Sequence, residues 1–523
     1  MAVQAPAPIV RSPFQLTPIP ETDFSSFVLR QSPRLGDRPA LVDAPSGRTI
    51  TYGQLAPLVR RAAAGLAARG FRQGDVLAIY APNVPEYGVA VHAILSLGGV
   101  VTTANPLYTP AELARQLADS GARAILTVPP FLDAARQAAA ETGCDELYVL
   151  GEGPGATPFR ALLEGSGEPP EARIEPEDIA TMLYSSGTTG VPKGVQLSHR
   201  ANIANAMQCR IALDMTERDI IVAVAPFFHA MGFTCLLNTG LATGAKVVSL
   251  PRFDLEGFLQ AIQDHRATQT VIAPPVALAL ARHPAVDRYD LSSLRFIGCG
   301  AAPLGKEIEE ACEARLGCGF HQGYGMTEAT AGIAVSSMAE PERNVHGQAG
   351  LLLPGTEARV VDPETGADLG AGATGEILIR GPQLMSGYLN RPDATAETID
   401  ADGWLHSGDI GRMDEEGRVY ITDRMKELIK YKAFQVAPAE LEALLCSHPS
   451  IAAAAVVGAP DEAAGEIPTA FVVAHGELDD DELMAWVAER VAPHKRIRRV
   501  ERVDSIPASP SGKILRRELR ERL

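Results

Sequence analysis

The stretch "IATMLYSSGTTGVPKGVQL", residues 179–197, decides the fold, because it places a glycine-rich loop between two apolar strand patterns. The loop combines turn-forming glycines, one lysine and four hydroxyl residues, which can hold a phosphate through backbone N–H groups and side-chain donors: Gly187, Gly190, Gly194, Lys193, Ser185, Ser186, Thr188 and Thr189. Its spacing does not fit G-x-x-x-x-G-K-[ST], whose loop leads into a helix. Taken alone, a solvated turn rich in turn-forming residues is the simpler alternative.

Strand and helix patterns alternate on both sides of this loop. A helix is predicted to begin at Thr109-Pro110, followed by a strand at Ala124–Val128. This alternation predicts a mostly parallel sheet covered by helices. After about Gly347, short apolar runs separated by turns predict antiparallel strands in a small barrel, and beyond "DRMKELIK" a small α+β unit follows. The predicted fold class is therefore α/β.

Charge and composition exclude several classes of protein. The chain has 523 residues and a net charge of −17, so an anionic ligand needs a local basic patch, and general binding to nucleic acid is not expected. Seven cysteines without a C-x-x-C pair argue against a disulfide framework or a zinc site. We see no signal peptide, no S-K-L ending and no apolar run of roughly 18 residues, so we expect a cytoplasmic protein without a membrane span.

The second constellation is "QGYGMTEAT", residues 322–330. Tyr324 stands between Gly323 and Gly325, so neither neighbour blocks the face of its ring from a flat ligand. Thr327 and Glu328 supply a hydroxyl and a carboxylate, which suit phosphate and Mg²⁺. The alternative is a turn at the end of a strand.

Three further stretches carry charged residues that could contact a nucleotide or an oxyanion. In "GWLHSGDIGRMD", Asp409 can accept hydrogen bonds from ribose hydroxyls, although an Asx turn explains it equally well. In "SPSGKILRREL", Lys513 follows a Ser-Gly turn and can reach an oxyanion as a mobile point charge. The stretch "DRMKELIKYKAFQVAP" groups basic residues for which a solvated face is the simpler interpretation: Arg424, Lys426, Lys430 and Lys432.

These five stretches, in this order, resemble the adenylate-forming superfamily of acyl-CoA ligases, peptide-synthetase adenylation domains and luciferases, over about residues 25–520. "SSGTTGVPKGV" and "GEILIRG" look most like the 4-coumarate–CoA ligase branch. The resemblance implies a ligase that converts an acid and ATP to an acyl-adenylate and then transfers the acyl group to coenzyme A. It also implies an N-terminal adenylation domain, residues 1–424, with helix-covered sheets and a small β-barrel, and a small mobile α+β domain, residues 425–523.

The resemblance assigns the site residues as follows. Lys513 would bridge the acid and the α-phosphate, and Glu328 and Thr188 would meet Mg²⁺. Tyr324 would stack on adenine, and Asp409 and Arg424 would hold the ribose. The implied ATP and AMP contacts together are Ser185, Ser186, Gly187, Thr188, Thr189, Gly190, Lys193, Gln322, Gly323, Tyr324, Gly325, Thr327, Asp409 and Arg424. Lys193 is then a phosphate-loop residue and not the main catalyst.

For the thioester step, the resemblance implies that the C-terminal domain rotates about Lys426. Lys430 and Gln435 would then line the active site, and Lys432, Ala433 and Phe434 would contact coenzyme A. Relatives usually have glycine where this chain has Ala433, which puts the efficiency of thioester formation in doubt. Two alternatives stay open: an enzyme that stops at the adenylate or transfers to an amine or carrier protein, and a non-catalytic ATP-binding protein.

The implied acid pocket contains His229, which would gate the acid, and is otherwise uncharged. Hydroxycinnamate ligases commonly have tyrosine at the position of Met231, and a proline–valine pair where this chain has Ala331 and Gly332. We therefore expect an apolar acid, aryl-acrylate or medium-chain aliphatic, bound by an enzyme that is a monomer or a homodimer. The pocket residues are His229, Met231, Cys299, Ala301, Gly323, Ala329, Thr330, Ala331 and Gly332.

Overall fold

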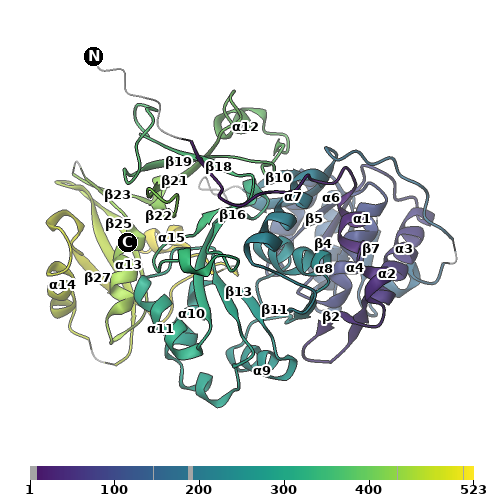
Figure 1. The fold of residues 1–523 in the computed structure, drawn as a ribbon, viewed down its shortest axis with the longest axis horizontal. Helices are drawn as coiled ribbons and strands as arrows, with labels where there is room; N and C mark the ends of the chain where they lie inside the picture. Colours follow the sequence, from purple (N-terminus) through teal and green to yellow (C-terminus); the bar gives the residue numbers. More distant parts are fainter. Residues whose placement is uncertain are drawn as a thin grey trace.

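Four β-sheets organise the part of the chain that the structure describes (Figure 1). The structure is a computed structural model, and it describes residues 9–144, 146–165, 167–185, 192–432, 434–476, 478–510 and 512–523. Two large sheets with their helices and a half-barrel form the large N-terminal domain, and the fourth sheet belongs to the smaller C-terminal domain. The predicted α/β class is confirmed.

The first large sheet carries the glycine-rich loop. Its strand order is β20-β10-β9-β5-β4-β6-β7-β8, parallel except where β10 pairs with β9 and β20. The bounds are β4 (Val76–Tyr80), β5 (Val100–Thr103), β6 (Ala122–Thr127), β7 (Glu146–Val149), β8 (Thr157–Pro158), β9 (Ile179–Ser185), β10 (Lys193–Ser198) and β20 (Gly387–Tyr388).

The second large sheet carries the tyrosine between two glycines. Its order is β17-β16-β15-β14-β13-β11-β12-β2-β3, parallel from β15 to β2. The bounds are β2 (Pro39–Asp43), β3 (Thr49–Thr51), β11 (Ile220–Ala223), β12 (Lys246–Ser249), β13 (Gln269–Ile272), β14 (Phe296–Cys299), β15 (Gly319–Gly325), β16 (Gly332–Val335) and β17 (Leu351–Leu352).

Helices cover these sheets and begin where the sequence supplies caps. The predicted start at Thr109 is confirmed: its hydroxyl accepts from the N–H of Glu112, and the Glu112 carboxylate accepts from the N–H of Thr109. The helices are α1 (Phe24–Leu29), α2 (Ser32–Leu35), α3 (Tyr52–Ala68), α4 (Pro85–Ser96), α5 (Pro110–Ser120), α6 (Leu132–Thr142), α7 (His199–Ala212), α8 (Thr239–Thr243), α9 (Leu255–His265), α10 (Pro274–Arg282), α11 (Lys306–Leu316) and α12 (Pro392–Thr398). Single turns are η1 (Pro129–Phe131), η2 (Phe159–Leu162), η4 (Pro284–Arg288), η5 (Thr327–Ala329) and η6 (Pro341–Arg343).

The half-barrel and the C-terminal domain complete the chain. The half-barrel is antiparallel, in the order β1 (Val10–Arg11), β18 (Glu357–Val361), β19 (Gly375–Arg380), β21 (Leu405–Met413), β22 (Val419–Arg424). The domain boundary at 424/425 stays a prediction. The strand before it, β22, belongs to the half-barrel, and the strand after it, β23, belongs to the fourth sheet. The C-terminal domain contains η7 (Met425–Glu427), β23 (Ile429–Tyr431), β24 (Phe434–Val436), α13 (Pro438–Ser447), β25 (Ile451–Asp461), β26 (Gly465–Ala474), α14 (Asp480–Ala488), η8 (Pro493–Lys495), β27 (Arg499–Arg502) and α15 (Arg516–Arg520).

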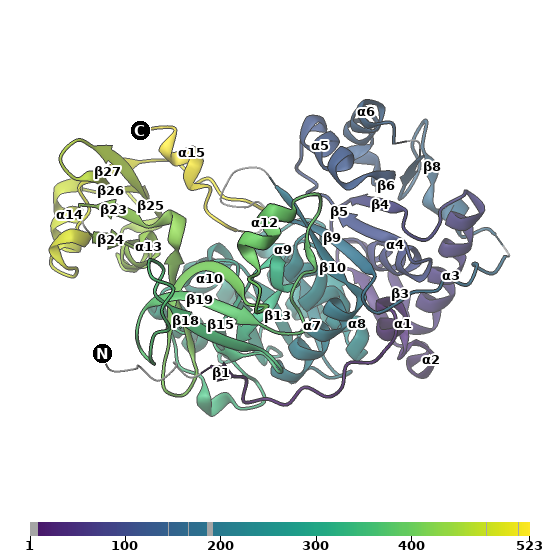
Figure 2. The same ribbon diagram turned by 90° about the horizontal axis from the view of Figure 1, so that it is seen from above.

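The small domain lies at one end of the molecule, and the segment before α15 runs back toward the large domain (Figure 2). Ala439 at the start of α13 donates its N–H to the Asp423 carboxylate at 2.8 Å. The last strand of the half-barrel therefore caps the first helix of the C-terminal domain, because that N–H has no partner within the helix.

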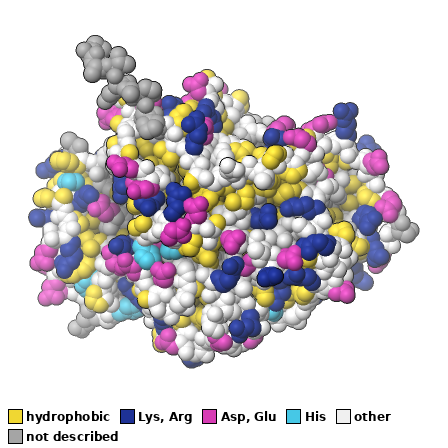
Figure 3. All heavy atoms as spheres, viewed as in Figure 1, with side chains coloured by type: hydrophobic (Ala, Val, Ile, Leu, Met, Phe, Trp, Pro, Cys, Tyr) yellow, Lys and Arg dark blue, Asp and Glu magenta, His cyan; other side chains and the backbone are white. Residues whose placement is uncertain are grey.

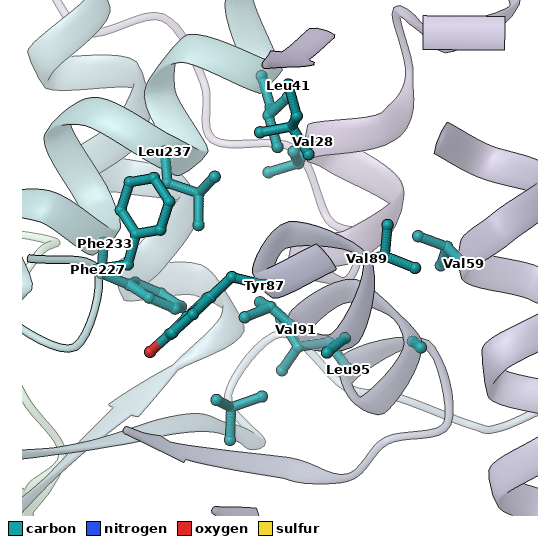
Figure 4. Packing of buried hydrophobic residues seen from close by; sticks show 14 of the residues in the cluster. Val28, Leu41, Val59, Tyr87, Val89, Val91, Leu95, Phe227, Phe233 and Leu237 are labelled. Carbon is teal, nitrogen blue, oxygen red and sulfur yellow. The ribbon is translucent and has the colours of Figure 1, made fainter. Parts of the chain in front are cut away.

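The main core anchors a π-helix, η3 (Met231–Asn238), beside strands β11 and β13 of the second sheet. Phe233 and Leu237 are fully buried and point into a cluster in which Tyr87 meets Phe227 edge-on at 5.5 Å (Figure 4). The Asn238 side chain donates to the Phe233 carbonyl, and Thr239 donates to the Thr234 carbonyl, both five residues back. The backbone N–H of Thr239 also donates to the Thr234 carbonyl, which is the i→i−5 bond that defines a π-helix, a form frequently found at functional sites.

Charges of both signs are mixed over the face shown in Figure 3, where Lys and Arg side chains alternate with Asp and Glu. Such a surface gives no general attraction to polyanions. Among the helices in the described ranges, none combines the length and the apolar character that a membrane crossing requires.

Candidate functional site

The glycine-rich loop joins two antiparallel strands, as predicted. Ser185 at the end of β9 pairs with Lys193 at the start of β10. The Lys193 ammonium lies 4.5 Å from the centre of the Tyr388 ring, and the Tyr388 hydroxyl donates to Oε1 of Glu328 at 2.9 Å. One aromatic side chain therefore contacts both the loop lysine and the predicted metal ligand. The remaining loop residues lie outside the described ranges: Ser186, Gly187, Thr188, Thr189 and Gly190.

A hydrogen-bonded chain joins the second sheet to the half-barrel. The Tyr324 hydroxyl donates to Oδ2 of Asp409 at 2.6 Å, and Nε of Arg424 lies 3.2 Å from Oδ1 of the same carboxylate. Burial raises the pKa of the Asp409 carboxyl, and the positive charge of Arg424 opposes this. The three predicted nucleotide residues thus meet although they come from β15, β21 and β22.

Gly325 must be glycine because its backbone passes very close to β16. A Cβ at this position would lie 1.8 Å from the carbonyl oxygen of Ala331, whereas a Cβ at Gly323 would make an ordinary contact at 3.4 Å with Val335. The Gln322 side chain is turned away from this loop and bonds to Leu304 and Glu309. Its predicted contribution to nucleotide binding would therefore be indirect, through the position of Gly323.

Lys513 reaches this centre from the C-terminal domain. Its loop is closed by a bond from the Gly512 N–H to the Ser509 carbonyl at 2.8 Å. Gly512 adopts φ +84°, and a Cβ there would lie 2.5 Å from Cβ of Ala273 in the large domain. Burial, together with the positive charge of Arg424, lowers the pKa of Lys513 to about 8. Lys513 is therefore a desolvated amine whose charge interacts with Arg424 and Asp409.

His229 lies close enough to Lys513 to interact with its charge. Burial, together with the positive charge of Lys513, lowers the pKa of His229 to about 4. Nδ1 of His229 accepts from the N–H of Met231 at 3.4 Å, which leaves the ring proton on Nε2. His229 is therefore neutral and can donate from Nε2.

The predicted acid-pocket residues divide into two groups. A Cβ added at Gly300 would lie 3.4 Å from Sδ of Met231 and 3.6 Å from the carbonyl oxygen of Gly323, so these three residues converge. Cys299 is the last residue of β14, directly before Gly300, and its thiol packs in the core beneath α10 and α11. Because successive side chains on a strand face opposite sides, Cys299 is not brought to Met231. Ala329 and Thr330 are fully buried, and Ala331 packs with Ala230 and Tyr388.

Sequence reasoning missed Asn205, which fixes the strand that carries Gly332. Oδ1 of Asn205 accepts from the Gly332 N–H, and Nδ2 donates to the Gly332 carbonyl, both at 3.0 Å. A Cβ at Gly332 would lie 3.5 Å from Sγ of Cys209, whose sulfur is 3.8 Å from that of Cys235. Asn205, Cys209 and Cys235 come from α7 and η3, and no local motif marks them.

The residues predicted to act in the second step, Lys430 and Gln435, lie on an exposed hairpin of the small domain. Lys430 pairs with Gln435 across β23 and β24, and both side chains are exposed. Phe434 is 52% exposed and stacks on His494 at 4.5 Å. Lys432 has φ +54°, and Ala433 lies outside the described residues. Lys426, the predicted hinge, is exposed in η7. The structure brings Lys513, and not this hairpin, to Asp409.

Several residues of the predicted site have a strained backbone conformation. Of the six described non-glycine residues with positive φ, three belong to the predicted site: Ala301 (74°), Thr330 (63°) and Lys432 (54°). Such conformations cost about 1–3 kcal/mol each and cluster at ligand sites.

Comparison with known proteins agrees with this geometry. Residues 28–389 match the AMP-binding enzyme family, and residues 440–513 match the AMP-binding enzyme C-terminal domain. The chain belongs to the AMP-binding enzyme family. The match to the C-terminal domain ends at Lys513 itself. Like its curated relatives, this AMP-binding enzyme is an AMP-forming acid–CoA ligase.

Three similar proteins illustrate the family. The 4-coumarate–CoA ligase 3 of Oryza sativa subsp. japonica is 43% identical over 498 residues, which cover 94% of this chain and 90% of the relative. The anthranilate CoA ligase AuaEII in complex with anthranoyl-AMP has a TM-score of 0.89 at 25% identity and covers 97% of this chain and 98% of its own. The amide bond synthetase McbA from Marinactinospora thermotolerans has a TM-score of 0.85 at 30% identity, covering 95% and 100%.

Proposed function

We propose that this acid–CoA ligase activates an apolar carboxylic acid, either an aryl-acrylate of the cinnamate and 4-coumarate type or a medium-chain fatty acid. Two findings support this choice. The relatives named 4-coumarate–CoA ligase are 41–43% identical to this chain. The converging pocket residues Met231, Gly300 and Gly323 carry no charge, so a second carboxylate would have no partner among them.

The observation that carries the proposed mechanism is the position of Lys513. Its loop packs against Ala273, its ammonium lies in the electrostatic field of Asp409 and Arg424, and its own charge acts on His229. We assign Tyr324 to adenine, Asp409 and Arg424 to the ribose, and Thr327 to the α-phosphate. The acid carboxylate and the α-phosphate repel each other, and Lys513 supplies positive charge where they join, an effect of about 10²–10³-fold per group.

Mg²⁺ fits the same site. Glu328 offers a carboxylate that is held in place by the Tyr388 hydroxyl, and oxygen ligands are those that Mg²⁺ prefers. When bound, Mg²⁺ would neutralise phosphate charge. Ser185 and Lys193 would hold the β- and γ-phosphates together with the part of the loop between them.

The proposed second step uses the small domain in another orientation, turned about Lys426. Lys430 and Gln435 would then reach the adenylate, and Lys432, Ala433 and Phe434 would contact coenzyme A. Transfer to an amine is the second candidate, favoured by Ala433 in place of the usual glycine and by the similarity to McbA.

The deciding experiment incubates the enzyme with ATP, Mg²⁺, coenzyme A and a panel of acids, and measures pyrophosphate, AMP and thioester. Cinnamate, 4-coumarate and octanoate should release AMP only with coenzyme A, while malonate should be poor. A preference for malonate would contradict the apolar pocket. Adenylate that forms amide but no thioester would support the second candidate.

The roles of the two lysines are tested in the same assay. Lys193→Ala should weaken ATP handling moderately, because the cation helps to hold the leaving pyrophosphate. Lys513→Ala should nearly abolish adenylation, because that charge is needed in the transition state. The reverse order of effects would contradict these assignments.

A further inference from the structure

Glu309, His321 and His346 form a compact group behind the adenine loop. They come from α11, β15 and the loop after η6. Glu309 is fully buried, His321 is 8% exposed, and His346 is half-buried. One oxygen or nitrogen atom from each lies within 4.8 Å of the other two. Two imidazoles and one carboxylate are a common set of ligands for a transition metal.

The distances within the group suit a shared ion better than a hydrogen bond. Nδ1 of His321 and Oε1 of Glu309 are 3.4 Å apart, beyond the usual range of about 2.7–3.2 Å for a hydrogen bond. Two ligand atoms bound to one tetrahedral ion at about 2.0–2.1 Å are separated by about 3.3 Å. The His346 ring lies next to the His321 ring, with centres 5.6 Å apart, and one ring nitrogen of His346 lies within 4.8 Å of the ligand atoms of the other two residues.

Hydrogen bonds from neighbouring residues hold Glu309 and His346 in place, as the residues around a metal site hold the metal ligands. The other Glu309 oxygen accepts from the Gly347 N–H at 2.8 Å and from Nε2 of Gln322 at 3.2 Å. Nε2 of His346 bonds to Glu313 at 2.6 Å, the carboxylate–histidine pairing that orients metal-binding imidazoles.

The local charge also favours a cation. Three carboxylates surround the two imidazoles, because Glu310 lies 3.7 Å from Nδ1 of His346, in addition to Glu309 and Glu313. The one lysine seen to pair with them among the described residues is Lys306, 3.3 Å from Glu310. The group therefore has excess negative charge and a buried carboxylate without a permanent cation beside it.

We propose that Glu309, His321 and His346 bind a divalent transition-metal ion such as Zn²⁺, at a site separate from Glu328. Mixed nitrogen and oxygen ligands select Zn²⁺ or Co²⁺ over Mg²⁺. The ion would tie α11 and the loop around residue 346 to β15. The residue after His321 is Gln322, which leads directly into Gly323–Gly325, so occupancy would stiffen the base of the adenine loop.

The test uses the full-length protein after removal of metals with a chelator. Zn²⁺ is titrated in competition with a chromophoric chelator, and Co²⁺ is titrated by visible absorption. We expect one tight equivalent and a rise in melting temperature. The Co²⁺ complex should lack thiolate charge-transfer bands, which separates this site from binding by the seven cysteines.

His346→Ala and His321→Asn should each weaken Zn²⁺ binding by roughly 100-fold or more, because each removes a direct ligand and loss of a mere supporting residue already costs 10–100-fold. His475→Ala, which removes an exposed histidine in the other domain, is the matched control and should bind as the unchanged protein does. Circular dichroism and melting in the presence of the chelator show whether each variant is folded. Absence of a tight equivalent in the unchanged protein, or tight binding that survives both substitutions, would overturn the proposal.

Discussion

Arg282 offers a direct test of whether contacts between the domains favour adenylation. It is the last residue of α10, and its guanidinium donates to the carbonyl oxygen of Ile451 at 3.0 Å and to that of Cys446. The Cys446 carbonyl belongs to the last turn of α13, where helix carbonyls lack partners and carry the negative end of the dipole. Both bonds exist only while the small domain is docked as described here.

The expected size of the effect follows from these two bonds. A hydrogen bond from a charged group is worth about 1.5–3 kcal/mol when buried, but Arg282 is exposed to solvent, so we take about 1 kcal/mol in total. Arg282→Ala should therefore lower the ratio of docked to undocked molecules by about fivefold, and the adenylation rate by up to the same factor.

The assay separates the two half-reactions. ATP–pyrophosphate exchange reports adenylation, and single-turnover transfer from preformed adenylate to coenzyme A reports the second step. Arg288→Ala is the matched control, because Arg288 pairs with Glu256 inside the large domain. We expect slower exchange without slower transfer in Arg282→Ala. Unchanged exchange, or equal slowing of both steps, would refute the reasoning.

Three further predictions concern the site itself. Lys513 has a pKa of about 8 and acts as a cation, so kcat/KM for adenylation should fall about tenfold per pH unit above that value; a flat profile there would contradict its role. Gly325→Ala should raise the KM for ATP far more than Gly323→Ala, because the new Cβ meets a carbonyl oxygen at 1.8 Å instead of a methyl group at 3.4 Å; equal effects would contradict this. Asn205→Ala loses two bonds to Gly332, about 1–2 kcal/mol, and should raise the KM for the acid about 5- to 30-fold while leaving the Kd for ATP unchanged, as measured by calorimetry.

The sequence predicted local features well. The strand pattern on both sides of the glycine-rich loop, the helix start at Thr109 and the antiparallel strands after Gly347 are all confirmed. Each of these depends on residues close together in the chain, where periodicity and capping are informative. The resemblance to a family added the residues of the site, and the structure brings Tyr324, Asp409, Arg424 and Lys513 together.

Contacts between distant segments could not be predicted in this way. Asn205 and Gly332 are 127 residues apart, and the group of Glu309, His321 and His346 draws on three separate elements without a spacing signature. For Cys299, the sequence did not predict the direction in which the side chain points. Its position in the chain places it beside the acid pocket, but the alternation of side chains along β14 turns the thiol to the opposite side.

Tyr388 keeps the charges of Lys193 and Glu328 apart in the enzyme without nucleotide. It separates an ammonium, Lys193, from a carboxylate, Glu328, by contacting the first with its ring face and the second with its hydroxyl. Had these two charges met directly, they would have neutralised each other. A neutral spacer gives each a weak partner that is easily exchanged. An incoming nucleotide with its counter-ion can thus meet this ammonium and this carboxylate without first breaking an ion pair between the two.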